Sequence, residues 1–120
     1  MGLHVGAVTF DAGDAARLSA FWAAALGATA RPARELAGAF VVEPSAAGPL
    51  MLFLPVPEPK TAKNRCHLDL HTADYLGDLA RLESLGAVVV QHHDEAGRWV
   101  VLHDPEGNEL CLVEDLAGPA

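Results

Sequence analysis

Positively charged residues are scarce in this sequence. Lys and Arg together number 8 among 120 residues, against 16 Asp and Glu, so the formal net charge is −8 at pH 7. Proteins that bind nucleic acid rely on Lys and Arg side chains to neutralise phosphates and release counterions. We therefore expect no nucleic-acid partner, and we attribute the negative charge to solubility.

Cysteine and long apolar runs are scarce too. The two cysteines, Cys66 and Cys111, both stand in apolar patterns typical of strands, which predicts buried thiols and not a disulfide framework. No apolar run is long enough to cross a bilayer, and the N-terminus shows neither a basic leader nor a myristoylation signal. We accordingly expect no membrane association and a cytoplasmic location.

Hydrophobic residues are abundant, at 51% of the chain, and their pattern divides the sequence into two similar halves. Leu26-Gly27-Ala28 ends the helix of the first half, and Leu85-Gly86-Ala87 ends that of the second. Each half predicts one strand, one helix and three further strands (βαβββ), which indicates a duplicated module. The predicted strands cover residues 3–10, 28–35, 39–43, 50–54, 66–71, 87–91, 99–103 and 109–113, and the predicted helices cover residues 15–26 and 75–85.

This pattern predicts an α+β fold in a single domain over residues 1–120. The first module is expected to cover about residues 1–55, a proline-rich linker about 55–63, and the second module about 64–116. Two such modules are expected to form a curved, partly open mixed sheet around a cleft, with the helices on the outside.

Some residues indicate how individual elements begin, end and pack. Asp14 is a predicted N-cap and Gly27 a predicted helix end. Residues 91–94 are expected to form a solvated loop, and residues 104–108 a tight turn. The apolar side of the second helix is expected to consist of Leu76, Leu79, Leu82 and Leu85.

The stretch from Asn64 to His71 alternates strictly between polar and apolar residues. On a strand, this alternation places the two kinds of residue on opposite faces. The apolar face must pack on a core, so the polar face points to solvent or into a cavity. The polar face consists of Arg65, His67, Asp69 and His71, and the apolar face of Cys66, Leu68 and Leu70.

Three stretches together resemble the vicinal oxygen chelate superfamily, which includes glyoxalase I, extradiol dioxygenases, and fosfomycin- and bleomycin-resistance proteins. The resemblance is to its small stand-alone glyoxalase-like proteins, and it covers nearly the whole chain. It implies the duplicated βαβββ fold, but this fold serves isomerases, dioxygenases, transferases and binding proteins alike. The stretches are 14–27 with Phe21-Trp22, 56–70 with Asn64-Arg65-Cys66-His67-Leu68-Asp69-Leu70, and 99–113 with Asp104-Pro105-Glu106-Gly107-Asn108-Glu109.

The resemblance also implies where a metal would bind, because metal-dependent members carry a ligand on the first and last strands of each module. The internal repeat places these positions at Ala7, Leu52, His67 and Cys111, and the first two cannot bind a metal. We therefore expect no metal cofactor; if a divalent ion binds, His67 and Cys111 hold it, with Glu109 or Asp69 to complete the set. His67, Asp69 and His71 could hold iron if all three converged, but residues two apart on a strand are separated by almost 7 Å along it, so a flat strand cannot close a compact site.

A cavity lined by apolar residues and a few polar ones is the usual make-up of a small-molecule site. The pattern predicts such a site for a partly aromatic ligand with one polar edge. The predicted ligand-binding residues are Val5, Ala7, Thr9, Leu52, Leu54, Arg65, His67, Asp69, Trp99, Val101, His103, Glu109 and Cys111, with Val113 beside them.

Two functions are compatible with these residues, so the sequence leaves open whether the protein is an enzyme. The first is metal-independent binding of a small organic molecule, as in the bleomycin-binding members. The alternative is a metal-dependent or acid–base lyase, isomerase or dioxygenase that acts on a small oxygenated substrate. In it His67 is the general acid or base, and Asp69 or Glu109 orients it. Since family members commonly pair modules between chains, we also expect a homodimer.

Overall fold

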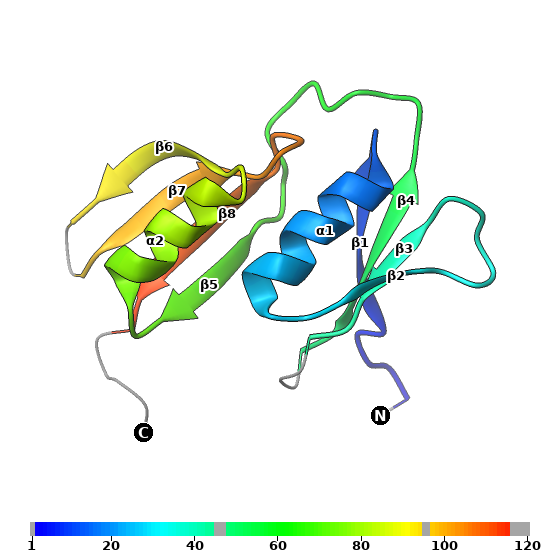
Figure 1. Cartoon of the computed structure of the whole chain (residues 1–120), viewed down its shortest axis with the longest axis horizontal. Coiled ribbons are helices and arrows are strands. Elements are labelled where there is room, and N and C mark those ends of the chain that lie inside the picture. The colour runs from blue at the N-terminus through cyan, green and yellow to red at the C-terminus, as the bar shows by residue number, and fades with distance from the viewer. Residues whose placement is uncertain (1, 45–47, 95–96, 116–120) are drawn as a thin grey trace. The chain divides into compact units, whose positions relative to one another are not determined.

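The structure, a computed structural model, describes residues 2–44, 48–94 and 97–115. The chain divides into two compact units, residues 1–59 and 60–120 (Figure 1). Within the described ranges, each unit contains four strands and one helix in the order βαβββ. The α+β fold and its duplication, predicted from the sequence, are confirmed.

The first unit is built around an aromatic core. Its sheet has the strand order β1-β4-β3-β2, with β1 and β4 parallel and the other pairs antiparallel. The Phe10 ring packs against Trp22 of the helix, at 5.4 Å between centroids, and stacks on Phe53, at 5.2 Å. The elements are β1 (Ala7–Ala12), α1 (Ala15–Leu26), β2 (Ala30–Pro32), β3 (Phe40–Val42) and β4 (Leu50–Pro55).

Helix α1 has the predicted bounds because both of its ends are locally encoded. The Asp14 carboxylate accepts a hydrogen bond from the Arg17 amide at 3.0 Å and caps the first turn. Gly27 ends the helix with φ 65°, a left-handed conformation that only glycine adopts without strain.

The second unit repeats the arrangement, with strand order β5-β8-β7-β6 and β5 parallel to β8. The Asp74 carboxylate caps its helix by accepting a hydrogen bond from the Gly77 amide at 3.2 Å. The predicted turn is also present: buried Asp104 accepts hydrogen bonds from the amides of Glu106 and Asn108. The elements are β5 (Leu68–Thr72), α2 (Tyr75–Ser84), β6 (Val88–His93), β7 (Trp99–His103) and β8 (Glu109–Glu114).

Alternation along β7 and β8 gives the second sheet two unlike faces. One face packs into the core with Val100, Leu102 and Leu110, each fully buried. The opposite face carries the partly exposed Trp99 and His103. We call this second face the open face, because Trp99 and His103 are partly exposed on it. It holds the polar residues that the sequence singled out.

Three expectations about the second unit are wrong. Cys66 is exposed, not buried, because β5 begins only at Leu68 and the alternation does not reach it. Leu76 is 65% exposed, since Tyr75 takes the buried position at the start of α2. The predicted loop at residues 91–94 is mostly strand, as β6 continues through His93 and pairs with Trp99.

Strand bounds differ from prediction where the partner strand decides them. β1 begins at Ala7 and not at residue 3, because its pairing with β4 begins at Leu50. Leu3 and Val5 therefore precede the sheet and are exposed. Part of the loop expected between residues 43 and 50, and residue 116 at the predicted end of the second module, lie outside the described residues. No helix in the described part of the chain is long and apolar enough to cross a membrane.

Candidate functional site

The open face of the second sheet is organised in three cross-strand rows. Because directly paired residues share a face, the strand register determines which side chains are neighbours. The middle row contains the thiol, and the rows on either side contain the imidazoles. The rows are Glu109, His103 and Val88; Asp69, Cys111, Val101 and Gln91; and His71, Val113, Trp99 and His93.

His67, Asp69 and Cys111 form a compact cluster on this face. Their ligand atoms, one from each residue, all lie within 4.8 Å of one another. His67 Nδ1 is 3.2 Å from Asp69 Oδ1, and both side chains are about half exposed. The flat-strand spacing does not separate His67 from Asp69, because His67 precedes β5, and the cluster contains Cys111 in place of His71.

Cys111 is a protonated thiol at neutral pH. Burial, followed by the charge of Asp69 and the hydrogen bond that its carboxylate accepts from the thiol, raises the pKa of Cys111 from 9.0 to about 11. Lys63 has a smaller, opposite effect. Because the thiolate is the nucleophilic form, Cys111 is a poor nucleophile at neutral pH.

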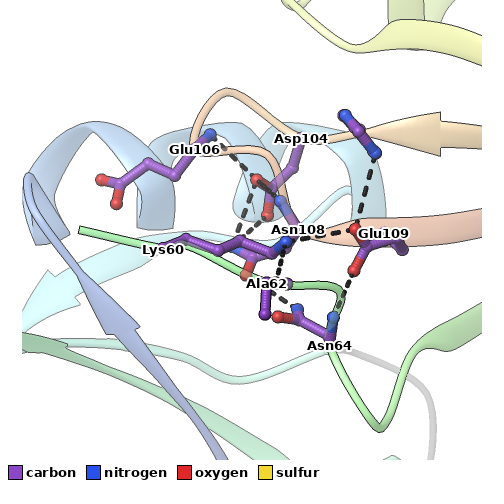
Figure 2. Close-up of polar contacts among 8 residues, drawn as sticks. Lys60, Ala62, Asn64, Asp104, Glu106, Asn108 and Glu109 are labelled. Atoms are coloured by element: carbon purple, nitrogen blue, oxygen red, sulfur yellow. Dashed lines mark hydrogen bonds and ion pairs between the residues drawn. The ribbon is translucent and has the colours of Figure 1, made fainter.

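Glu109 lies beside this cluster, but its oxygens have other partners (Figure 2). Oε1 accepts a hydrogen bond from the backbone amide of Asn64 at 2.8 Å, and Oε2 one from Lys60 Nζ at 3.2 Å. His103 Nε2 is 3.5 Å from Oε2. Burial alone would raise the pKa of Glu109, but the hydrogen bonds from Asn64 and Lys60 outweigh it and lower the pKa below its ordinary value.

An aromatic pair forms the far end of the open face. The rings of His93 and Trp99 stack with centroids 3.7 Å apart and planes 6° apart. Both residues are partly exposed and directly paired across β6 and β7. A flat, preformed aromatic surface of this kind favours stacking with planar groups.

The cluster fits a metal ion in size and in donor type, with one nitrogen, one oxygen and one sulfur ligand. Zinc bonds of 2.0–2.3 Å put tetrahedral ligand atoms roughly 3.3–3.8 Å apart, which small side-chain movements from the present positions would allow. A metal would bind Cys111 as the thiolate and would release the thiol proton on binding. Thr9 pairs with Leu52 as Asp69 pairs with Cys111, so the repeat assigns Ala7 and Leu52 to the metal positions of the first unit, and neither has a donor side chain.

The structure brings together some of the predicted site residues. His67, Asp69 and Cys111 lie together, and Glu109 lies against His103. Arg65 is exposed, two residues before His67. In the first unit, Thr9 and Leu52 are paired on one face of their own sheet, and Ala7 and Leu54 share that face by alternation, whereas Val5 precedes the sheet.

Four residues of this neighbourhood were missed at the sequence level. Lys60 lies in the predicted linker and Asn108 in the predicted turn, whereas Asn64 begins the alternating stretch but was given no part in the site. His93 was assigned to a loop. The sequence signal for His93 is its distance from Gly97 and Trp99, which is compatible with a hairpin. No local signal pairs Lys60 with Glu109, since 49 residues separate them.

Comparison with known proteins identifies the family. Residues 7–113 match the family of glyoxalase-like domains, and the chain therefore belongs to this family. This confirms the resemblance to the vicinal oxygen chelate superfamily. No curated protein sequence matches significantly.

Solved structures of this superfamily are similar along their whole length. A glyoxalase/bleomycin resistance protein/dioxygenase family enzyme from Burkholderia phytofirmans PsJN is 15% identical, with a TM-score of 0.77, over 95% of this chain and 100% of that one. TnmS3, an antibiotic binding protein from Streptomyces sp. CB03234, is 24% identical, with a TM-score of 0.69, over 95% and 98%. A mutant of the fosfomycin resistance protein FosX from Listeria monocytogenes, solved with Mn(II) and dihydroxypropylphosphonic acid, is 13% identical, with a TM-score of 0.75, over 97% and 93%. At these identities the likeness shows the fold alone.

Proposed function

We propose that the protein binds a small, partly aromatic organic molecule without a metal ion, on the open face of the second sheet. The stacked His93–Trp99 pair carries this proposal, because it offers a planar group a flat partner beside a row of polar side chains. Successive rows are about 7 Å apart along the strands. A ring on Trp99 therefore lies one row away from Val101 and Cys111, whose row also contains Asp69.

One observation supports binding without a metal. The metal positions of the first unit are occupied by Ala7 and Leu52, which have no donor side chain. The antibiotic-binding neighbour TnmS3 is consistent with a binding role, at the level of the fold. The first unit's predicted ligand-binding residues stay a prediction.

The experiment is calorimetric titration of chelator-treated protein with a set of fused-ring aromatic compounds. We expect at least one to bind, and Trp99→Leu to weaken its binding about two- to tenfold, the range of one aromatic contact. Trp99→Phe is the matched control, because it keeps a ring and should retain most of the affinity. If no compound binds, or if binding needs added divalent metal, the proposal is wrong.

A second candidate function is acid–base catalysis, favoured by the contact between His67 and Asp69. A carboxylate that accepts from Nδ1–H orients the ring and leaves Nε2 as the proton acceptor. Asp69 fills the orienting role, whereas Glu109 is engaged by Asn64 and Lys60. Turnover of a small oxygenated compound that is lost in His67→Gln, in a protein whose melting temperature is unchanged, would favour the enzyme over the binding protein.

We also propose that the protein is a cytoplasmic homodimer. Each sheet ends in edge strands, β1 and β2 in one unit and β5 and β6 in the other. Exposed edges tend to be covered by further strands or by association.

A further inference from the structure

We propose that Glu109 is a positioning residue, which fixes the chain before β5 and thereby places His67 beside Asp69. It acts as part of a connector clasp, defined as Lys60, Asn64, Asn108 and Glu109. This inference goes beyond ligand binding, because it concerns how the open face acquires its shape.

The clasp joins the chain before β5 to the end of the β7–β8 hairpin (Figure 2). Glu109 accepts from the Asn64 amide and from Lys60, as described above. The Asn64 side chain also donates to Asn108 Oδ1 at 2.9 Å. Only 10% of the Glu109 side chain is exposed, so these hydrogen bonds are partly shielded from water and gain strength.

The far side of the clasp is a turn held by buried hydrogen bonds. Asn108 Nδ2 donates to both carboxylate oxygens of Asp104, at 3.2 and 3.0 Å. Asp104 is 3% exposed and also holds the amides of Glu106 and Asn108. Asn64 is therefore attached to a turn whose own conformation is fixed by buried hydrogen bonds.

Attachment of Asn64 restricts the position of His67. The β5–β8 ladder begins with the pair Leu68 and Leu110, immediately after Glu109. Residues 65–67 therefore run between a fixed point at Asn64 and the first ladder residue. Short segments closed at both ends have few conformations, so the clasp limits where the His67 ring can lie relative to Asp69 and Cys111.

The role of Glu109 rests on an oxygen acceptor more than on charge. The Asn64 amide needs only an acceptor at Oε1, which a glutamine carbonyl also provides. Lys60, by contrast, contacts the other oxygen. Glu109→Gln should therefore keep His67 in place, whereas Glu109→Ala should release it.

The test is nuclear magnetic resonance of the full chain, with the His67 imidazole and Asn64 amide assigned. In Glu109→Ala we expect both signals to shift, while the amides of Val100 and Leu112 stay in place. In Glu109→Gln both signals should stay near their original positions. The matched control is Glu114→Ala. It removes a carboxylate from the same strand and breaks the ion pair between Glu114 and Arg98, but it leaves all the residues of the clasp unchanged.

The inference is overturned if the His67 signal is unmoved by Glu109→Ala, if Glu114→Ala moves it equally, or if Glu109→Gln shifts it as far as alanine does. Should Glu109→Ala fail to fold, Asn64→Pro carries the test, because it removes both Asn64 contacts of the clasp, the backbone N–H to Glu109 and the side chain to Asn108, and leaves Glu109 intact. The same His67 shift is then expected, and its absence overturns the inference. No ligand is needed, so this result is independent of whether any aromatic compound binds.

Discussion

The protein contains two thiols in contrasting environments, and we expect them to react with iodoacetamide at very different rates. Cys66 is exposed, whereas Cys111 is buried and donates to Asp69. At a pKa of about 11, Cys111 is roughly one part in a thousand thiolate near pH 8, against about one part in ten at its own ordinary pKa of 9.0. Since the thiolate is the reactive form, this difference alone slows Cys111 about a hundredfold.

Mass spectrometry of samples quenched at intervals measures the two rates separately. Restricted access also slows a buried thiol, but that factor does not change with pH. A raised pKa predicts that the Cys111 rate continues to rise about tenfold per pH unit up to about pH 11. In denaturant both thiols should react alike, which provides the control.

Substitution of Asp69 separates the causes of this pKa shift. Asp69→Asn removes the negative charge, so the Cys111 pKa should fall, although burial, the largest cause, persists. The pKa of Cys111 is higher in the folded protein than in the unfolded chain. The contribution of the protonated thiol to the free energy of unfolding is therefore complete below the unfolded pKa and is lost as pH rises toward about 11. Equal reaction rates for the two native thiols near pH 8 would refute the reasoning.

Three further predictions concern stability and assembly. Leu110→Ala should lower the free energy of unfolding by about 2–5 kcal/mol in a denaturant titration, because Leu110 is fully buried. His67→Ala should change the free energy of unfolding by no more than about 0.5 kcal/mol. Equal losses in the two variants would mean that His67 belongs to the core. Gly107→Ala should cost about 1–3 kcal/mol, since Gly107 has φ 85°, while Gly6→Ala, which meets open space, is the neutral control. Light scattering at micromolar concentration should give the mass of a homodimer, and a monomer there would contradict this expectation.

Local sequence determined the elements whose ends are encoded within a few residues. The bounds of α1 follow from Asp14 and Gly27, which cap the helix through contacts at most four residues away. The repeat of the βαβββ order follows from hydrophobic periodicity, which is also a local property. The open face of the second sheet follows from alternation along β7 and β8 in the same way.

Tertiary structure decided which residues meet. Alternation assigns Cys111 and Asp69 to a face, but only the β5–β8 register makes them neighbours. Strand ends likewise depend on the partner strand, as at Ala7, and burial in α2 depends on the sheet beneath it. The contact of Lys60 with Glu109 joins residues 49 positions apart. Such contacts are set by strand order and register, which arise from the summed packing of the whole unit and leave no periodic trace in the sequence around either residue.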